Sequence, residues 1–149
     1  MLILVATDSS WIVDTIVAAL GDDDTSFTVC GEGRHVSRVV QQRTEDASAP
    51  DYDLAILDLQ IGSMGGMAVA MALRLDESAG VLPHVPALML LDRKADVHLA
   101  RRSGAEGWLV KPLDALRLRR AATTVTGGGA YHNGPVRQEV IEGEPAPAS

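Results

Sequence analysis

Five short apolar runs, each followed by a segment with helical spacing, constrain the fold of this chain more than any other feature. Branched residues are common in these runs, and they predict buried strands at residues 2–6, 26–33, 52–59, 85–91 and 106–110. The segments that follow predict helices at residues 8–20, 35–43, 67–78, 94–104 and 112–125. Strands that are apolar on both faces and alternate with helices predict an α/β fold, with a doubly wound parallel sheet covered on both sides.

Composition excludes several classes of protein. A net charge of −7 and an aromatic content of 3% argue against a nucleic-acid-binding surface, which needs basic groups and stacking rings. No apolar run approaches the ~20 residues that cross a bilayer, and Asp8 interrupts the first run too early for a signal peptide. The single cysteine, Cys30, excludes an internal disulfide and favours a small core residue. We therefore expect a cytoplasmic protein with no membrane contact.

The carboxyl ends of the predicted strands carry the polar residues of a candidate site. Asp8 follows the first strand, Asp58 lies at the end of the third, and Lys111 follows the fifth. Because these ends meet at one edge of a parallel sheet, where ligands bind, we expect the three side chains to converge. Two carboxylates suit Mg²⁺, and a lysine opposite them can hold a phosphoryl oxygen. A carboxylate can also be the nucleophile that accepts a phosphoryl group.

Each of these residues also has a simpler interpretation. Asp58 alone is as well explained as a helix cap or turn former, and Asp8 or Ser9 can cap the helix that follows them. Lys111 alone is typical of a solvated strand end, and only the joint arrangement favours a functional site. The four histidines lie in different segments without the spacing of metal ligands, and we interpret them as surface residues: His35, His84, His98 and His132.

Two segments resemble the receiver domains of bacterial two-component response regulators. The stretch "LAILDLQIGSMGGM" (54–67) resembles their phospho-acceptor segment, and "SGAEGWLVKPL" (103–113) resembles their Gly-Ala, aromatic and Lys-Pro segment. The resemblance covers about residues 1–126, which we expect to form the domain. It implies a flavodoxin-like sheet of five parallel strands in the order 2-1-3-4-5, with five helices. Residues 127–149 have linker composition, and we expect them to be a tail that is at least partly disordered.

The same resemblance implies a role for individual residues. Asp58 is implied to be the phospho-acceptor and Lys111 the phosphate-binding lysine. Asp8, Asp58 and the backbone carbonyl of Gln60 are implied to bind Mg²⁺. The Lys111–Pro112 bond is expected to be cis, as is common in the family.

The sequence also departs from the family pattern around the acceptor. Thr7 stands where a second acidic residue is usual, and Leu91 replaces the Thr or Ser that ends the fourth strand. Gly62 and Gly65 replace a proline and an acidic residue, and Trp108 replaces the Tyr or Phe that acts as a switch. The missing carboxylate weakens the Mg²⁺ site, and Leu91 cannot donate a hydrogen bond to a phosphoryl oxygen. We therefore expect an atypical receiver with an incomplete activation apparatus.

The tail and the basic residues suggest partners. Residues 121–141 resemble the segment that joins receiver and helix-turn-helix domains in NarL/FixJ-type regulators. This favours a fragment of a transcription factor, whose LuxR-type output domain would contact DNA from outside these residues, over a free-standing receiver. The resemblance also implies a sensor histidine kinase as partner. The expected homodimer face lies around residues 94–125, and it is formed by the fourth predicted helix, the fifth predicted strand and the fifth predicted helix.

Two other functions stay open on the sequence alone. A pseudo-receiver would keep the fold and act as a dimerisation, ligand-binding or protein-interaction module without phosphorylation. An enzyme on the same architecture is the weakest of the three, because no Gly-rich phosphate loop follows the first strand. We therefore do not expect an enzyme.

Overall fold

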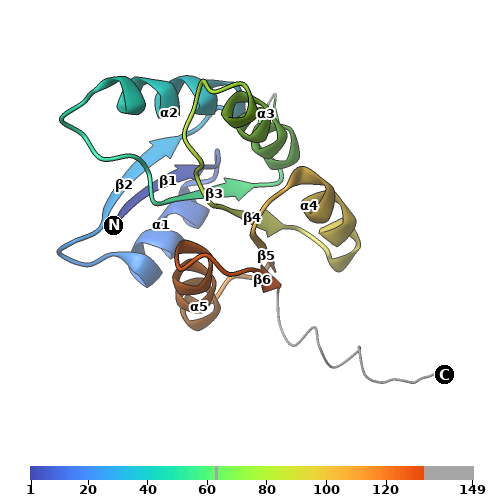
Figure 1. The fold of residues 1–149 in the computed structure, drawn as a ribbon. Helices are drawn as coiled ribbons and strands as arrows, with labels where there is room; N and C mark the ends of the chain where they lie inside the picture. The colour runs from blue at the N-terminus through green and yellow to red at the C-terminus, as the bar shows by residue number, and fades with distance from the viewer. Residues whose placement is uncertain (63, 133–149) are drawn as a thin grey trace.

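A single six-stranded parallel sheet organises the computed structural model, which describes residues 1–62 and 64–132 (Figure 1). The strand order is β2-β1-β3-β4-β5-β6, a flavodoxin-like arrangement. The strands are β1 Leu2–Ala6, β2 Ser26–Cys30, β3 Leu54–Asp58, β4 Ala87–Leu91, β5 Gly107–Val110 and β6 Tyr131–His132. The sheet thus has one strand more than the five that the sequence predicts.

Five α-helices cover the two faces of the sheet, as predicted. They are α1 Ser10–Leu20, α2 Val36–Glu45, α3 Gly66–Ser78, α4 Val97–Ser103 and α5 Ala115–Thr126. One 3₁₀ turn precedes α2, at Gly33–His35, and another precedes α4, at Lys94–Asp96. Helices α1 and α5 lie together on one face, and α2, α3 and α4 lie on the other (Figure 1). None of the helices in the described residues is long and apolar enough to span a bilayer.

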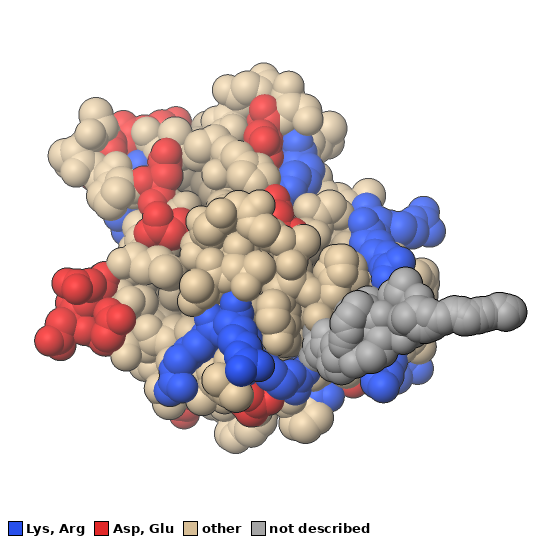
Figure 2. Space-filling view, turned by 60° about the horizontal axis from the view of Figure 1, so that its bottom comes forward, with Lys and Arg blue, Asp and Glu red and all other residues tan. Residues whose placement is uncertain are grey.

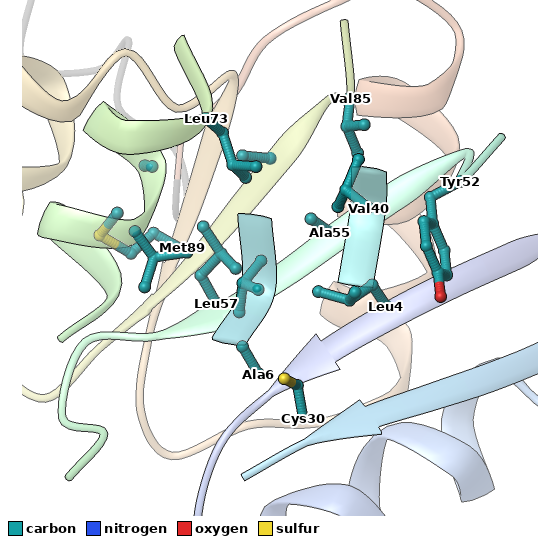
Figure 3. Close-up of a cluster of buried hydrophobic side chains, with 14 of the residues drawn as sticks. Leu4, Ala6, Cys30, Val40, Tyr52, Ala55, Leu57, Leu73, Val85 and Met89 are labelled. Carbon is teal, nitrogen blue, oxygen red and sulfur yellow. The ribbon is translucent and has the colours of Figure 1, made fainter. Parts of the chain in front are cut away.

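The two layers of helices explain why the strands are apolar at every position. Successive strand residues point to opposite faces, so Ile3 and Val5 of β1 pack towards α1 and α5. Leu4 and Ala6 of the same strand pack in the other cluster, together with Leu57 of β3 (Figure 3). All five residues of β1, β3 and β4 are buried. Cys30, a free thiol that is 7% exposed, lies in this second cluster, which confirms its prediction as a core residue.

The sixth strand is formed by residues that the sequence assigns to the tail. The chain turns after α5, and Tyr131 and His132 pair in parallel with Gly107 and Trp108 of β5. The prediction missed β6 because two residues carry no apolar period, and a contact with β5 holds them in place. The rest of the predicted tail, residues 133–149, lies outside the described residues.

Polar residues buried in this core point to the candidate site. Among the described residues they are Thr7, Asp58, Asp96 and Ser103. Asp96 accepts hydrogen bonds from the backbone and side chain of Arg93 beside α4, so its burial is explained locally. Thr7 and Asp58 follow or end neighbouring strands, and they contact each other.

Candidate functional site

Asp58 is the last residue of β3 and is 2% exposed. One carboxylate oxygen, Oδ2, accepts a hydrogen bond of 2.7 Å from the hydroxyl of Thr7. The other, Oδ1, lies 2.8 Å from Nζ of Lys111 and accepts a longer bond of 3.4 Å from the backbone N–H of Gln60. Burial of an ionised carboxylate is costly without such partners, so these donors are what hold Asp58 at the strand end.

Lys111 follows β5 and reaches two carboxylates at once. Its ammonium lies 2.8 Å from Oδ1 of Asp58 and 2.8 Å from Oδ1 of Asp92. Partial burial pulls the pKa of Lys111 down, but hydrogen bonds and charge contacts with both carboxylates outweigh burial and raise the pKa above its ordinary 10.5. The lysine therefore stays charged beside Asp58. The Lys111–Pro112 peptide bond is cis, as predicted.

Thr7 contributes to the site in a way that the sequence did not reveal. Its hydroxyl oxygen accepts a bond of 3.1 Å from the backbone N–H of Ser9, so the hydroxyl proton is left for Asp58. The register brings the two residues together, because Ala6 pairs with Leu57 immediately before them. In the sequence, Thr7 is notable only because it replaces an acidic residue. In the structure, its buried hydroxyl donates a hydrogen bond to Asp58, the candidate phospho-acceptor. The sequence could have indicated this role, because Thr7 carries a hydroxyl and follows β1, the strand that pairs with β3.

Asp8 lies at the exposed rim of the site. Its Oδ2 accepts a bond of 3.0 Å from the backbone N–H of Gly62, in the loop after β3. Ser9, and not Asp8, caps α1, since the Ser9 hydroxyl accepts from the backbone N–H of Ile12. The carboxylate of Asp8 is thus bound to the loop that carries Gln60.

Few side chains at the rim of the site, near Asp8, could act as ligands for a divalent cation. The described residues contain no group of three or more His, Cys, Asp or Glu side chains placed to hold a metal. Asp8, Asp58 and the carbonyl of Gln60 are the residues that would hold Mg²⁺, since they carry oxygen donors of the kind it prefers and Mg²⁺ commonly uses one or two carboxylates with several waters. The donor set therefore fits a hydrated Mg²⁺ rather than an ion enclosed by protein ligands.

The glycines after Asp58 serve the packing of the loop. A Cβ on Gly66 would lie 2.5 Å from the backbone oxygen of Asp58, and one on Gly65 would lie 2.6 Å from that of Leu59. The close approach that requires Gly65 and Gly66 is that of β3 to the start of α3.

The two predicted switch positions are both buried in the apolar core. Leu91 is fully buried at the end of β4 and offers no hydrogen-bond donor. Trp108 is 4% exposed, and its indole is stacked on the imidazole of His132, with ring centroids 4.1 Å apart and an angle of 13°. The guanidinium of Arg101 lies over the same indole, 5.6 Å from its centroid. No pattern in the sequence indicates this role of His132, which lies on a strand of two residues.

This geometry has a counterpart among known proteins. Residues 3–123 match the profile of the response regulator receiver domain. The chain belongs to this family. No curated protein sequence matches the chain. This receiver extends beyond the matched region to include β6.

Solved structures with 21–23% identity share the fold. The signal receiver domain of a signal transduction histidine kinase from Syntrophus aciditrophicus is 22% identical, with a TM-score of 0.69 over 85% of this chain and 90% of that one. The receiver domain of the putative response regulator NarL from Mycobacterium tuberculosis is 23% identical, with a TM-score of 0.68 over 85% and 96%. The Mn²⁺-bound form of response regulator Rcp1 is 21% identical, with a TM-score of 0.61 over 85% and 89%.

Proposed function

We propose that this receiver is the signal-receiving domain of a bacterial two-component response regulator, and that Asp58 is its phospho-acceptor. The observation that carries the proposal is the buried carboxylate of Asp58, 2% exposed, with the ammonium of Lys111 2.8 Å away. A carboxylate can accept a phosphoryl group as an acyl phosphate. The lysine supplies positive charge where the transferring group gathers negative charge.

The donor in this proposal is a phosphohistidine of a sensor histidine kinase. An oxygen of Asp58 attacks the phosphorus, the P–N bond breaks, and its electron pair leaves with the imidazole nitrogen, which takes up a proton. Lys111 then pairs with a phosphoryl oxygen in place of one of its present carboxylates. Mg²⁺, when bound by Asp8, Asp58 and the Gln60 carbonyl, supplies further neutralisation of the phosphoryl charge. The Mn²⁺-bound form of Rcp1 supports a divalent cation in a receiver of this fold.

The output in this proposal is transcription, through a DNA-binding domain outside these residues. The resemblance of residues 121–141 to the segment that joins receiver and helix-turn-helix domains supports this assignment. A homodimer through α4, β5 and α5 would place the exposed arginines of this acidic chain at the contact. Figure 2 shows basic side chains gathered on part of the surface. The exposed arginines of α4 and α5 include Arg101, Arg102 and Arg120.

Phosphorylation of Asp58 can be tested directly. The chain is incubated with Mg²⁺ and acetyl phosphate, and intact mass is followed with and without hydroxylamine, which cleaves acyl phosphates. We expect a gain of one phosphoryl group that hydroxylamine removes. Asp92→Asn is the matched control, because Asp92 also contacts Lys111, and it should keep the gain. Absence of the gain in the wild-type chain, or its persistence in Asp58→Asn, would contradict the proposal.

A phosphorylation-independent receiver is the second candidate, and two observations favour it. Both oxygens of Asp58 already accept hydrogen bonds, from Thr7 and Lys111, and Leu91 offers no donor to a phosphoryl group. In this alternative the domain works as a dimerisation, ligand-binding or protein-interaction module. The mass experiment separates the two candidates, because only the first requires a phosphoryl group on Asp58.

A further inference from the structure

The edge of the sheet beside β5 is occupied by a short strand of the same chain. β6 pairs in parallel with β5, so that Tyr131 lies opposite Gly107 and His132 opposite Trp108. The backbone N–H of Tyr131 donates to the carbonyl of Glu106 over 3.2 Å. Residues 106–108 therefore form a seat for an extended segment of two residues, and we refer to them as the seat.

Few interactions hold β6 on the seat. The imidazole of His132 stacks on Trp108 with 4.1 Å between centroids, and it helps keep that ring only 4% exposed. Tyr131 is half-buried and packs against the apolar cluster beneath α1 and α5. A strand of only two residues, one stacked pair and one half-buried ring place this segment at the low end of local stability.

The turn that returns the chain to the seat consists of three glycines, residues 127–129. Gly128 has φ +92°, in the left-handed region, and no atom lies within 4 Å of the position of a Cβ. The N–H groups of Gly128 and Gly129 close the turn on the carbonyls of Val125 and Thr124. Ordering glycines costs more backbone entropy than ordering any other residue. We call the arrangement in which β6 lies on the seat of its own chain closed. The turn is therefore the least favourable part of the closed arrangement, whereas the contacts on the seat are favourable.

We propose that β6 is an exchangeable strand, and that the seat also binds Tyr131–His132 of a second copy of this chain. Each chain carries one seat and one segment, so reciprocal exchange gives a closed two-fold dimer. The contacts on the seat are the same in monomer and dimer, and only the glycine turn opens. The entropy cost of ordering that turn and the protein concentration therefore set the balance. This inference is independent of any chemistry at Asp58.

The first test strains the turn without touching the seat. Gly128→Ala puts a side chain on a left-handed residue, which should shift the balance from closed to exchanged by roughly 5- to 30-fold. Light scattering after size-exclusion chromatography should show a larger dimer fraction that grows with concentration. Gly80→Ala is the matched control, because Gly80 has φ +78° and equally open surroundings after α3, and it should leave the dimer fraction unchanged.

Removal of the stacking ring provides the opposing variant. Gly128→Ala combined with His132→Ala should return to monomer, because the exchanged strand loses its contact with Trp108. Gly128→Ala combined with His132→Phe keeps a ring on Trp108 and should remain dimeric. A monomeric Gly128→Ala chain, or a dimer that survives His132→Ala, would overturn the proposal.

A mixing experiment detects the exchanged contact itself. A reporter chain carries Trp11→Phe and His132→Ala. Trp108 is then its only tryptophan, and no imidazole of the same chain stacks on it. A donor chain without tryptophan carries Trp11→Phe, Trp108→Phe and Gly128→Ala. Adding the donor should reduce acrylamide quenching of Trp108 in the reporter, whereas a donor that also carries His132→Ala should not. Equal quenching with both donors would contradict strand exchange.

Discussion

The hydrogen bond from Thr7 to Asp58 yields the most direct prediction from this structure. Thr7→Val removes the hydroxyl and keeps the shape of the side chain, which leaves Oδ2 of a 2%-exposed carboxylate without its 2.7 Å donor. Hydrogen bonds to charged groups contribute about 1.5–3 kcal/mol, and loss of a donor to a buried charge lies towards the upper part of that range. We therefore expect Thr7→Val to lower the free energy of unfolding by about 2–3 kcal/mol at neutral pH.

A double-mutant cycle isolates this pair. The free energy of unfolding is measured by urea denaturation for wild type, Thr7→Val, Asp58→Ala and the double variant. The effect of Asp58→Ala on Lys111 occurs in both arms and cancels, so the coupling energy should be about 1.5 kcal/mol or more. Thr7→Ser is the control, because it retains the hydroxyl. A coupling energy below about 0.5 kcal/mol would refute the argument that Thr7 holds the carboxylate.

Three further predictions concern the site and its supports. The raised pKa of Lys111 means that the charged lysine stabilises the fold fully below 10.5, and that this contribution is lost as pH rises through the raised value. Urea midpoints across alkaline pH should show this loss in wild type and not in Lys111→Met. Gly66→Ala should destabilise the chain by about 1–3 kcal/mol in urea, because its Cβ would meet the backbone oxygen of Asp58 at 2.5 Å. Glu106→Leu should cost about 1–3 kcal/mol in the same assay, because it removes the acceptor for Arg74 and for the backbone N–H of Ala87.

The parts of the fold that the sequence predicts are those with a repeated local pattern. Residues 2–6 and 54–58 are apolar at every position because helices cover both faces of the sheet, so the strands and the parallel sheet could be predicted from composition and spacing. Tyr131–His132 has no such pattern. Its strand depends on backbone pairing with β5 and on a ring stacked on Trp108, and these contacts with residues distant in sequence are not encoded by any local period.

The candidate site divides in the same way. Lys111 and Asp58 could be placed together because both end or follow parallel strands, and the structure brings their charged atoms to 2.8 Å. The hydrogen bond from Thr7 to Asp58 was not predicted, because Thr7 was compared only with the acidic residue usual at its position. Asp92 also follows a parallel strand, but its contact with the same lysine was not predicted, because the candidate site was built from Asp8, Asp58 and Lys111 alone.

The hydroxyl of Thr7 changes what the site requires in order to be stable. A carboxylate at this position would bring a second negative charge next to Oδ2 of Asp58, and two such charges in a buried place repel each other strongly unless a cation lies between them. Thr7 donates a proton there instead, and Lys111 neutralises the opposite oxygen. The carboxylate of Asp58 is therefore satisfied by the chain itself. A divalent cation would add to this arrangement from the rim, at Asp8, and the fold does not depend on it for the burial of Asp58.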